Sequence, residues 1–193
     1  MHDDGLNDMR RNIDAWWPAI EAGAEAILIN ASGCGSTVKE YGFHLQNDAQ
    51  YAQKAQRVSE LAKDIVEILI GETEGLKALF AHTPSAATLA YHPPCSLQHG
   101  QKLGGKVETL LSGLGYPVLL PKDSHLCCGS AGTYSFLQSE LSGRLLQNKV
   151  NNLEALQPKA VLSGNIGCIA HIGSGTDIPV MHWIEYLDQQ LGN

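Results

Sequence analysis

The stretch PVLLPKDSHLCCGSAGTY, residues 117–134, joins a short apolar run to a loop that carries two adjacent cysteines. The apolar run at 117–120 predicts a buried strand, and the residues that follow Cys127 and Cys128 are small. Thiolates are soft ligands that suit iron-sulfur clusters and zinc, and small neighbours leave room for such a group. The stretch therefore predicts a metal or iron-sulfur site just beyond a strand.

The other cysteines lie in similar surroundings. Cys95 follows two prolines and Cys168 follows a glycine, so that the spacing reads C-x31-C-C-x39-C. A free cysteine is often only a small buried hydrophobic residue, but packing alone explains poorly why four of them occupy separate Gly or Pro loops. The pattern predicts one site whose ligands are Cys95, Cys127, Cys128 and Cys168.

Two further residues are candidate ligands with less support. His171 stands three residues after Cys168, where a Cys-x-x-Cys pair would place its second thiolate, but a histidine there is also explained as a helix-surface residue. Cys34, between Gly33 and Gly35, has no co-ligand nearby in the sequence and is equally well explained by packing.

Several polar residues flank the cysteines. We expect His92, His99 and His125 to tune a bound group by hydrogen bonding to sulfur, although loop polarity explains them as well. Tyr134 and Lys39 are available to orient a substrate or partner, and the sequence assigns neither a definite role.

Composition excludes several classes of protein. With 193 residues, 44% hydrophobic and 17% charged, the chain has the composition of a soluble globular protein. A net charge of -7 argues against nucleic acid as a partner. Five cysteines, an odd number, fit a disulfide framework poorly. Neither a basic, apolar leader nor an apolar run of about 20 residues occurs, so we expect a cytoplasmic protein, at most peripheral at the inner face of the membrane.

Helical periodicity alternates with short apolar runs along the chain. Helices are expected over 7–22, after 33–35, and over 47–71, 73–81, 102–114, 136–154 and 182–191, and strands over 26–30, 87–91, 117–120 and 160–162. Short apolar strands between helices are typical of parallel sheets covered on both faces. The sequence therefore predicts a Rossmann-like α/β fold built from layered units.

The chain also contains an internal repeat. Superposing Cys34 on Cys168 aligns the apolar runs 26–28 and 160–162 as well, which predicts two related units, 1–83 and 84–193. The position that would match Cys127 and Cys128 in the first unit falls before Met1. We therefore expect the first unit to be truncated and the chain to be a C-terminal fragment of a longer polypeptide.

The arrangement C-x31-C-C-G-x38-C resembles the CCG cysteine-rich domain family. That domain occurs in the B subunit of heterodisulfide reductase, in lactate-utilisation proteins, in the C subunit of anaerobic glycerol-3-phosphate dehydrogenase and in glycolate oxidase. Within the family, the chain is most similar to the iron-sulfur subunits of glycolate oxidases, in the segments 32–35, 39–42, 125–134, 165–168 and 182–185.

This resemblance implies an electron-transfer subunit. A partner flavoprotein would oxidise glycolate to glyoxylate, and electrons would pass through 4Fe-4S clusters to a quinone or another acceptor. Flavin and substrate would sit on other subunits, so this chain alone would be inactive. The N-terminal ferredoxin-like region of the family has no counterpart in the sequence, in agreement with the expected truncation.

Other interpretations stay open at this point. Full CCG motifs end in Cys-x-x-Cys, whereas this chain has His171 at the last position, so the fragment would hold a cluster, zinc or no metal. A related oxidoreductase would act on lactate, glycerol-3-phosphate or a heterodisulfide. A structural zinc domain would only dock the flavoprotein. A thiol sensor would oxidise Cys127 and Cys128 reversibly without any metal.

Overall fold

The computed structural model describes residues 2–80 and 87–191. The chain divides into two compact units, Met1–Ile65 and Val66–Asn193, and each is described separately below. The predicted relationship between two repeated units, 1–83 and 84–193, stays a prediction, because a division into compact units does not show common ancestry.

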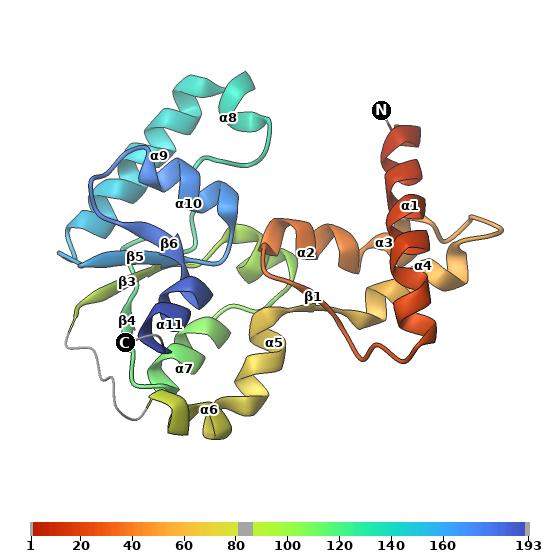
Figure 1. Cartoon of the computed structure of the whole chain (residues 1–193). Helices are drawn as coiled ribbons and strands as arrows, with labels where there is room; N and C mark the ends of the chain where they lie inside the picture. Colours follow the sequence, from red (N-terminus) through yellow and green to blue (C-terminus); the bar gives the residue numbers. More distant parts are fainter. Residues whose placement is uncertain (1, 81–86, 192–193) are drawn as a thin grey trace. The chain divides into compact units, whose positions relative to one another are not determined.

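The first unit packs helices on a pair of short parallel strands. Its elements are α1 (His2–Glu21), β1 (Ile27–Ile29), α2 (Ser32–Lys39), α3 (Tyr41–His44), α4 (Ala52–Leu61) and β2 (Ala62–Asp64). One face of α4 buries Ala55 and Val58 completely, and Ile13 of α1 joins the same core. Figure 1 shows these elements in red and orange.

The prediction of a single helix over 47–71 is wrong. The helix α4 ends at Leu61, and the next three residues extend as β2, with Ala62 opposite Ile27 and Asp64 opposite Ile29. The backbone polar groups of buried residues such as Ala62 and Asp64 must be paired, and β1 is the partner that β2 acquires. The need for this partner overrides the local helical pattern, which resumes only at α5 (Ile65–Leu69).

The second unit is built on a four-stranded parallel sheet in the order β4-β3-β5-β6. Its strands are β3 (Leu89–His92), β4 (Val118–Leu119), β5 (Ala160–Ser163) and β6 (Val180–His182). Every residue of β3 and β5 is buried, as expected for central strands of a parallel sheet. The strand β6 was not expected from the sequence.

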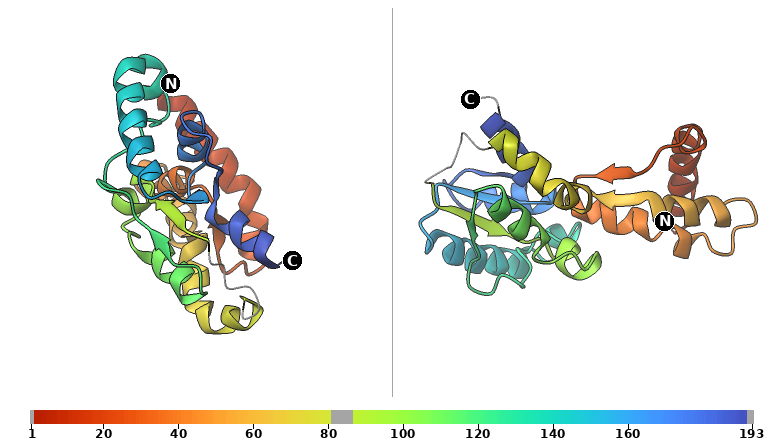
Figure 2. Two further views of the ribbon diagram at one scale, coloured as in Figure 1. Left: turned by 90° about the vertical axis from the view of Figure 1, so that its left-hand side faces the viewer. Right: turned by 90° about the horizontal axis from the view of Figure 1, so that it is seen from below.

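Helices cover both faces of this sheet. They are α6 (Thr73–Phe80), α7 (Lys106–Gly113), α8 (Tyr134–Leu137), α9 (Ser139–Glu154), α10 (Ile166–Gly173) and α11 (Trp183–Leu191), with the 3-10 turn η1 (Ile70–Glu72) and the π-helical turn η2 (Ser96–Gly100). Figures 1 and 2 show α9 and α10 on one face and α7 and α11 on the other. The α/β prediction is confirmed. Among the described helices, none is both long and apolar enough to cross a lipid bilayer.

The strand order fixes where a ligand site is expected. From β3 the chain passes to β4 on one side, and then returns to form β5 on the other side of β3. In open parallel sheets, ligands bind beyond the carboxyl ends of the strands at such a reversal of strand order.

Candidate metal centre

The second unit brings its four cysteines together at the carboxyl edge of the sheet. Cys95 follows β3 after two prolines, and Cys168 is the third residue of α10, which follows β5. Cys127 and Cys128 lie in the loop between β4 and α8, residues 120–133, which we call the CCG loop. These four residues form what we call the cysteine centre.

The thiols of the centre contact one another in series. Cys127 forms thiol hydrogen bonds with Cys128 and with Cys95, and Cys128 forms another with Cys168. Cys128 is completely buried and Cys168 is 4% exposed, whereas Cys95 and Cys127 are only half-buried. The centre therefore has a dry inner side and an outer side that reaches solvent.

Hydrogen bonding divides the four thiols into two kinds. Hydrogen bonds from Cys128 and then from Cys95 lower the pKa of Cys127, and a hydrogen bond from Cys128 lowers the pKa of Cys168 against the effect of burial. The pKa values of Cys95 and Cys128 are raised, because each keeps its proton for these hydrogen bonds and is also desolvated. Cysteines of lowered pKa therefore alternate with cysteines of raised pKa, and a lowered pKa favours the thiolate, which is the form that binds metal.

The third residue of the Cys-Cys-Gly sequence has to be glycine. Gly129 has φ +101, and a Cβ at this position would lie 2.6 Å from the carbonyl oxygen of Ser142 and 3.1 Å from His171 Nε2. Its amide donates to Cys127 Sγ at 3.3 Å. A larger residue would thus disturb both the packing on α9 and a contact to sulfur.

Side chains of α9 form hydrogen bonds with the CCG loop on both sides of its two cysteines. Ser142 Oγ donates to the carbonyl of Gly129 at 2.9 Å, and Lys149 Nζ donates to the carbonyl of Asp123 at 2.8 Å. Ser142 and Lys149 are 1% and 2% exposed; the serine hydrogen bond is buried and the lysine hydrogen bond is part-buried. The helix therefore holds the loop on either side of the two cysteines.

Ser142 and Lys149 were not expected from the sequence as residues of the site. Ser142 and Lys149 lie on the apolar stripe of α9, with Leu146, Val150 and Leu153 at helical spacing. A serine and a lysine on a buried stripe are the available signal, because buried polar groups are nearly always hydrogen-bonded.

His92 is the imidazole that lies nearest the sulfurs. One of its ring nitrogens and the sulfurs of Cys128 and Cys168 lie within 4.8 Å of one another. His92 contributes to lowering the pKa of Cys168, yet neither ring nitrogen makes a hydrogen bond of regular geometry among the described residues. A buried polar atom without a partner costs about 1–3 kcal/mol, which a bound group beside the sulfurs would recover.

His171 lies beside the loop rather than among the sulfurs. Its Nε2 is 3.2 Å from Ser142 Oγ, the hydroxyl that holds Gly129. Ligation by His171 stays a prediction, and the contact that the structure shows for this ring nitrogen is to serine.

The remaining candidates are His99, His125, Cys34, Lys39 and Tyr134. His99 Nε2 is 3.2 Å from the carbonyl oxygen of His125, so it links η2 to the CCG loop through the main chain. Cys34 is exposed in the first unit, as the third residue of α2, which matches the place of Cys168 in α10. Lys39 ends α2 and Tyr134 begins α8.

The cysteine centre fits an iron-sulfur or zinc group by its donors. It offers four soft sulfur atoms linked in series, two of them with lowered pKa values, and a buried imidazole beside them. All five cysteines, each within the described residues, are free thiols.

Comparison with known proteins agrees with this geometry. Residues 89–173, which span all four cysteines of the centre, match the CCG family, described as "Cysteine-rich domain". The uncharacterized protein YkgE of Escherichia coli K12 is 30% identical over 177 residues, which cover 88% of this chain and 72% of YkgE. The chain belongs to the CCG cysteine-rich domain family.

Two further members show its place in the family. The glycolate oxidase iron-sulfur subunit of E. coli K12 is 54% identical over 187 residues, which are 97% of this chain but 45% of that subunit. Lactate utilization protein A of Geobacillus thermodenitrificans is 28% identical over 182 residues, 88% of this chain and 72% of that protein. The resemblance of this CCG chain to glycolate oxidase iron-sulfur subunits is confirmed, and the chain spans less than half the length of the E. coli subunit.

Proposed function

We propose that this CCG chain is part of an iron-sulfur subunit of an oxidoreductase and that its cysteine centre holds the cluster. The observation that supports the proposal most directly is the meeting of Cys95, Cys127, Cys128 and Cys168 at one edge of the sheet, where their thiols are linked by hydrogen bonds. A bound 4Fe-4S cluster supplies a carrier of single electrons. Cys34 and His171 remain weaker candidates as ligands.

Buried and half-buried side chains would contact such a group on different sides. Cys128, Cys168 and His92 form the dry inner side and exclude water from it. Cys95 and Cys127 form the half-buried outer side, and electrons enter and leave most readily there because the distance to a partner is shortest. The chain has no assigned catalytic residue, since substrate chemistry belongs to the partner.

The names of two relatives support a proposal for the substrate and the partner. We propose that a flavoprotein of the same complex oxidises glycolate to glyoxylate and passes its electrons through this chain to a quinone or another acceptor. Lactate is the alternative substrate, because lactate utilization proteins are relatives as well. The complex would be cytoplasmic or peripheral at the inner face of the membrane.

Anaerobic reconstitution of the full chain with iron and sulfide tests this proposal. We expect iron and sulfide to be incorporated together and to give an EPR signal that changes on reduction. Cys127→Ser should abolish the signal, whereas Cys34→Ser, in the first unit, should keep it. Incorporation that survives Cys127→Ser would contradict the ligand set.

Zinc in a structural or docking domain is the second candidate. Zinc bound tetrahedrally at about 2.3 Å from sulfur and about 2.0 Å from nitrogen requires ligand atoms roughly 3.5–3.8 Å apart. The grouping of His92, Cys128 and Cys168 within 4.8 Å is compatible with such an ion. One zinc per chain, together with failure to incorporate iron and sulfide, would favour this function.

A further inference from the structure

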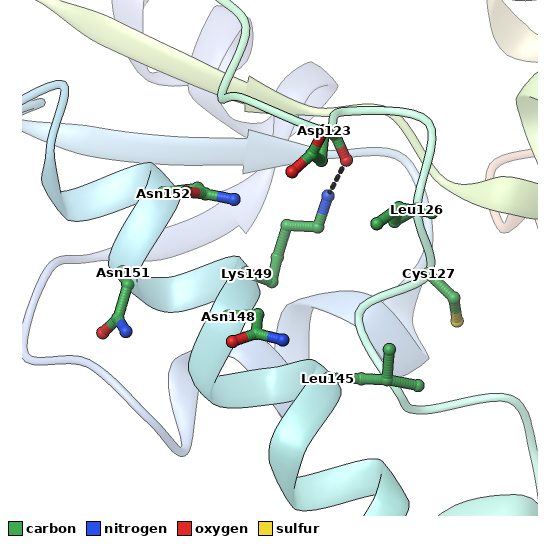
Figure 3. Close-up of a pocket in the computed structure, with 8 residues that line it drawn as sticks. All are labelled: Asp123, Leu126, Cys127, Leu145, Asn148, Lys149, Asn151 and Asn152. Atoms are coloured by element: carbon green, nitrogen blue, oxygen red, sulfur yellow. Dashed lines mark hydrogen bonds between the residues drawn. The ribbon is translucent and has the colours of Figure 1, made fainter.

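Lys149 is a buried cation beside the cysteine centre. Its side chain is 2% exposed, although it lines a cavity of about 330 Å³ together with Cys127 and Leu126. Figure 3 shows Lys149 reaching from α9 to the CCG loop at Asp123, with Cys127 further along the same loop. A lysine is almost never fully buried unless it is paired, so the position requires an explanation.

The direct partner of the ammonium is neutral. Lys149 Nζ donates to the main-chain carbonyl of Asp123 at 2.8 Å, and that carbonyl also accepts from the amide of Leu126 at 3.0 Å. Asp123 has φ +55, a backbone conformation that favours glycine, so the hydrogen bond holds the loop at a strained residue. One hydrogen bond to a carbonyl does not offset the loss of solvation of a charge.

The sulfurs and the carboxylate of Asp123 are the negative charges near the ammonium. Burial lowers the pKa of Lys149, and this is opposed by the negative charges that Cys128, Asp123, Cys127 and Cys168 carry when ionised. Metal binding requires the cysteines in that ionised form, and Cys127 lines the same cavity as Lys149. In surroundings of low dielectric, such charges interact more strongly than in water and are screened little by salt. The ammonium of Lys149 and the negatively charged sulfurs of the cysteine centre therefore stabilise each other.

We propose that Lys149 is a positioning residue of the centre, whose buried ammonium offsets the negative charge of the bound group and raises its reduction potential. This inference rests on the proposed function. One electron arrives from a reduced flavoprotein and one leaves to the acceptor, while Lys149 keeps its proton in both states. Reduction adds a negative charge beside a fixed positive one, so the reduced state is the one that Lys149 favours.

The charge can be separated from the hydrogen bond by two substitutions. Lys149→Gln removes the charge but keeps a donor for the Asp123 carbonyl, whereas Lys149→Met removes both. Lys122→Met is the matched control, because it removes one positive charge from the same loop at an exposed position. The potential of each reconstituted full chain is measured by redox titration followed by EPR.

We expect the ratio of reduced to oxidised centre, at the native midpoint, to fall about tenfold in both Lys149 variants, which is about 59 mV for a one-electron couple. Lys122→Met should stay within twofold of the native ratio. A native potential in Lys149→Gln, or a Lys149→Gln chain that binds no iron, would overturn the inference. Failure of the native chain itself to incorporate iron and sulfide would overturn the proposed function and this inference together.

Discussion

Replacing Gly129 with alanine tests the geometry of the CCG loop most directly. The new Cβ would lie 2.6 Å from the main-chain oxygen of Ser142, a distance that real Cβ atoms essentially never show, and φ +101 is unfavourable for alanine. Backbone strain of this kind costs about 1–3 kcal/mol, and overpacking a tight site costs about 1–3 kcal/mol more. We therefore expect Gly129→Ala to lower the free energy of unfolding by about 2–6 kcal/mol.

The same loop supplies the control. Gly132 also has a positive φ, +58, but a Cβ there would have no atom within 4 Å. Gly132→Ala should therefore cost only the left-handed backbone term, about 1–2 kcal/mol. Thermal unfolding followed by circular dichroism compares the two variants. At roughly 3 °C per kcal/mol for a chain of this size, Gly129→Ala should melt several degrees below Gly132→Ala.

Metal incorporation gives a second measure of the same substitution. The Gly129 amide donates to Cys127 Sγ, so a displaced loop also moves the sulfur. We expect less iron in Gly129→Ala than in Gly132→Ala after identical reconstitution. Equal melting temperatures and equal iron contents for the two variants would refute the steric argument.

The other predictions concern metal, the two histidines and pH. Zinc at 100 times its Kd should stabilise the chain by about 2.7 kcal/mol in thermal unfolding. Cys128→Ser should remove this stabilisation and Cys34→Ser should keep it. The opposite pattern would place the zinc site elsewhere. His92→Ala should lower the iron content, because His92 lies beside the sulfurs. His171→Ala should leave the iron content near native and lower the free energy of unfolding by about 1 kcal/mol, through loss of its contact to Ser142. Iron lost only in His171→Ala would show that His171, and not His92, is the histidine that supports the bound group. A main-chain amide hydrogen bond and an arginine lower the pKa of Asp48, so its stabilising effect is complete above the unfolded value near 3.9 and disappears as pH falls through the lowered folded pKa. Denaturant unfolding of Asp48→Asn should accordingly differ from the native chain at pH 7 and coincide with it in acid; a difference that persists in acid would exclude this cause.

The fold class and the meeting of the four cysteines could be predicted because both follow from short-range patterns. The runs that become β3 and β5 are mostly apolar, which indicates parallel strands covered on both faces. Cysteines that follow such strands necessarily lie at one edge of the sheet. The convergence of Cys95 with Cys168 needed no knowledge of side-chain packing.

The errors have a common physical cause, which is that the deciding partner is remote in sequence. Residues 62–64 continue a helical pattern, and only pairing with β1 makes them a strand. Lys149 and Ser142 act on main-chain carbonyls of the CCG loop, and a carbonyl has no signature in the sequence.

The strand order also determines when the centre can exist during synthesis. Cys95 leaves the ribosome about 70 residues before Cys168, an interval of roughly 4–15 s at ordinary translation rates. Until β5 inserts beside β3, the paired strands β3 and β4 bring only Cys95, Cys127 and Cys128 to their shared edge, and Cys168 is missing from the set. Loading of a metal group is therefore a late event in the life of the chain, and the early thiols pass through a period in which they are exposed to oxidation and to competing metals.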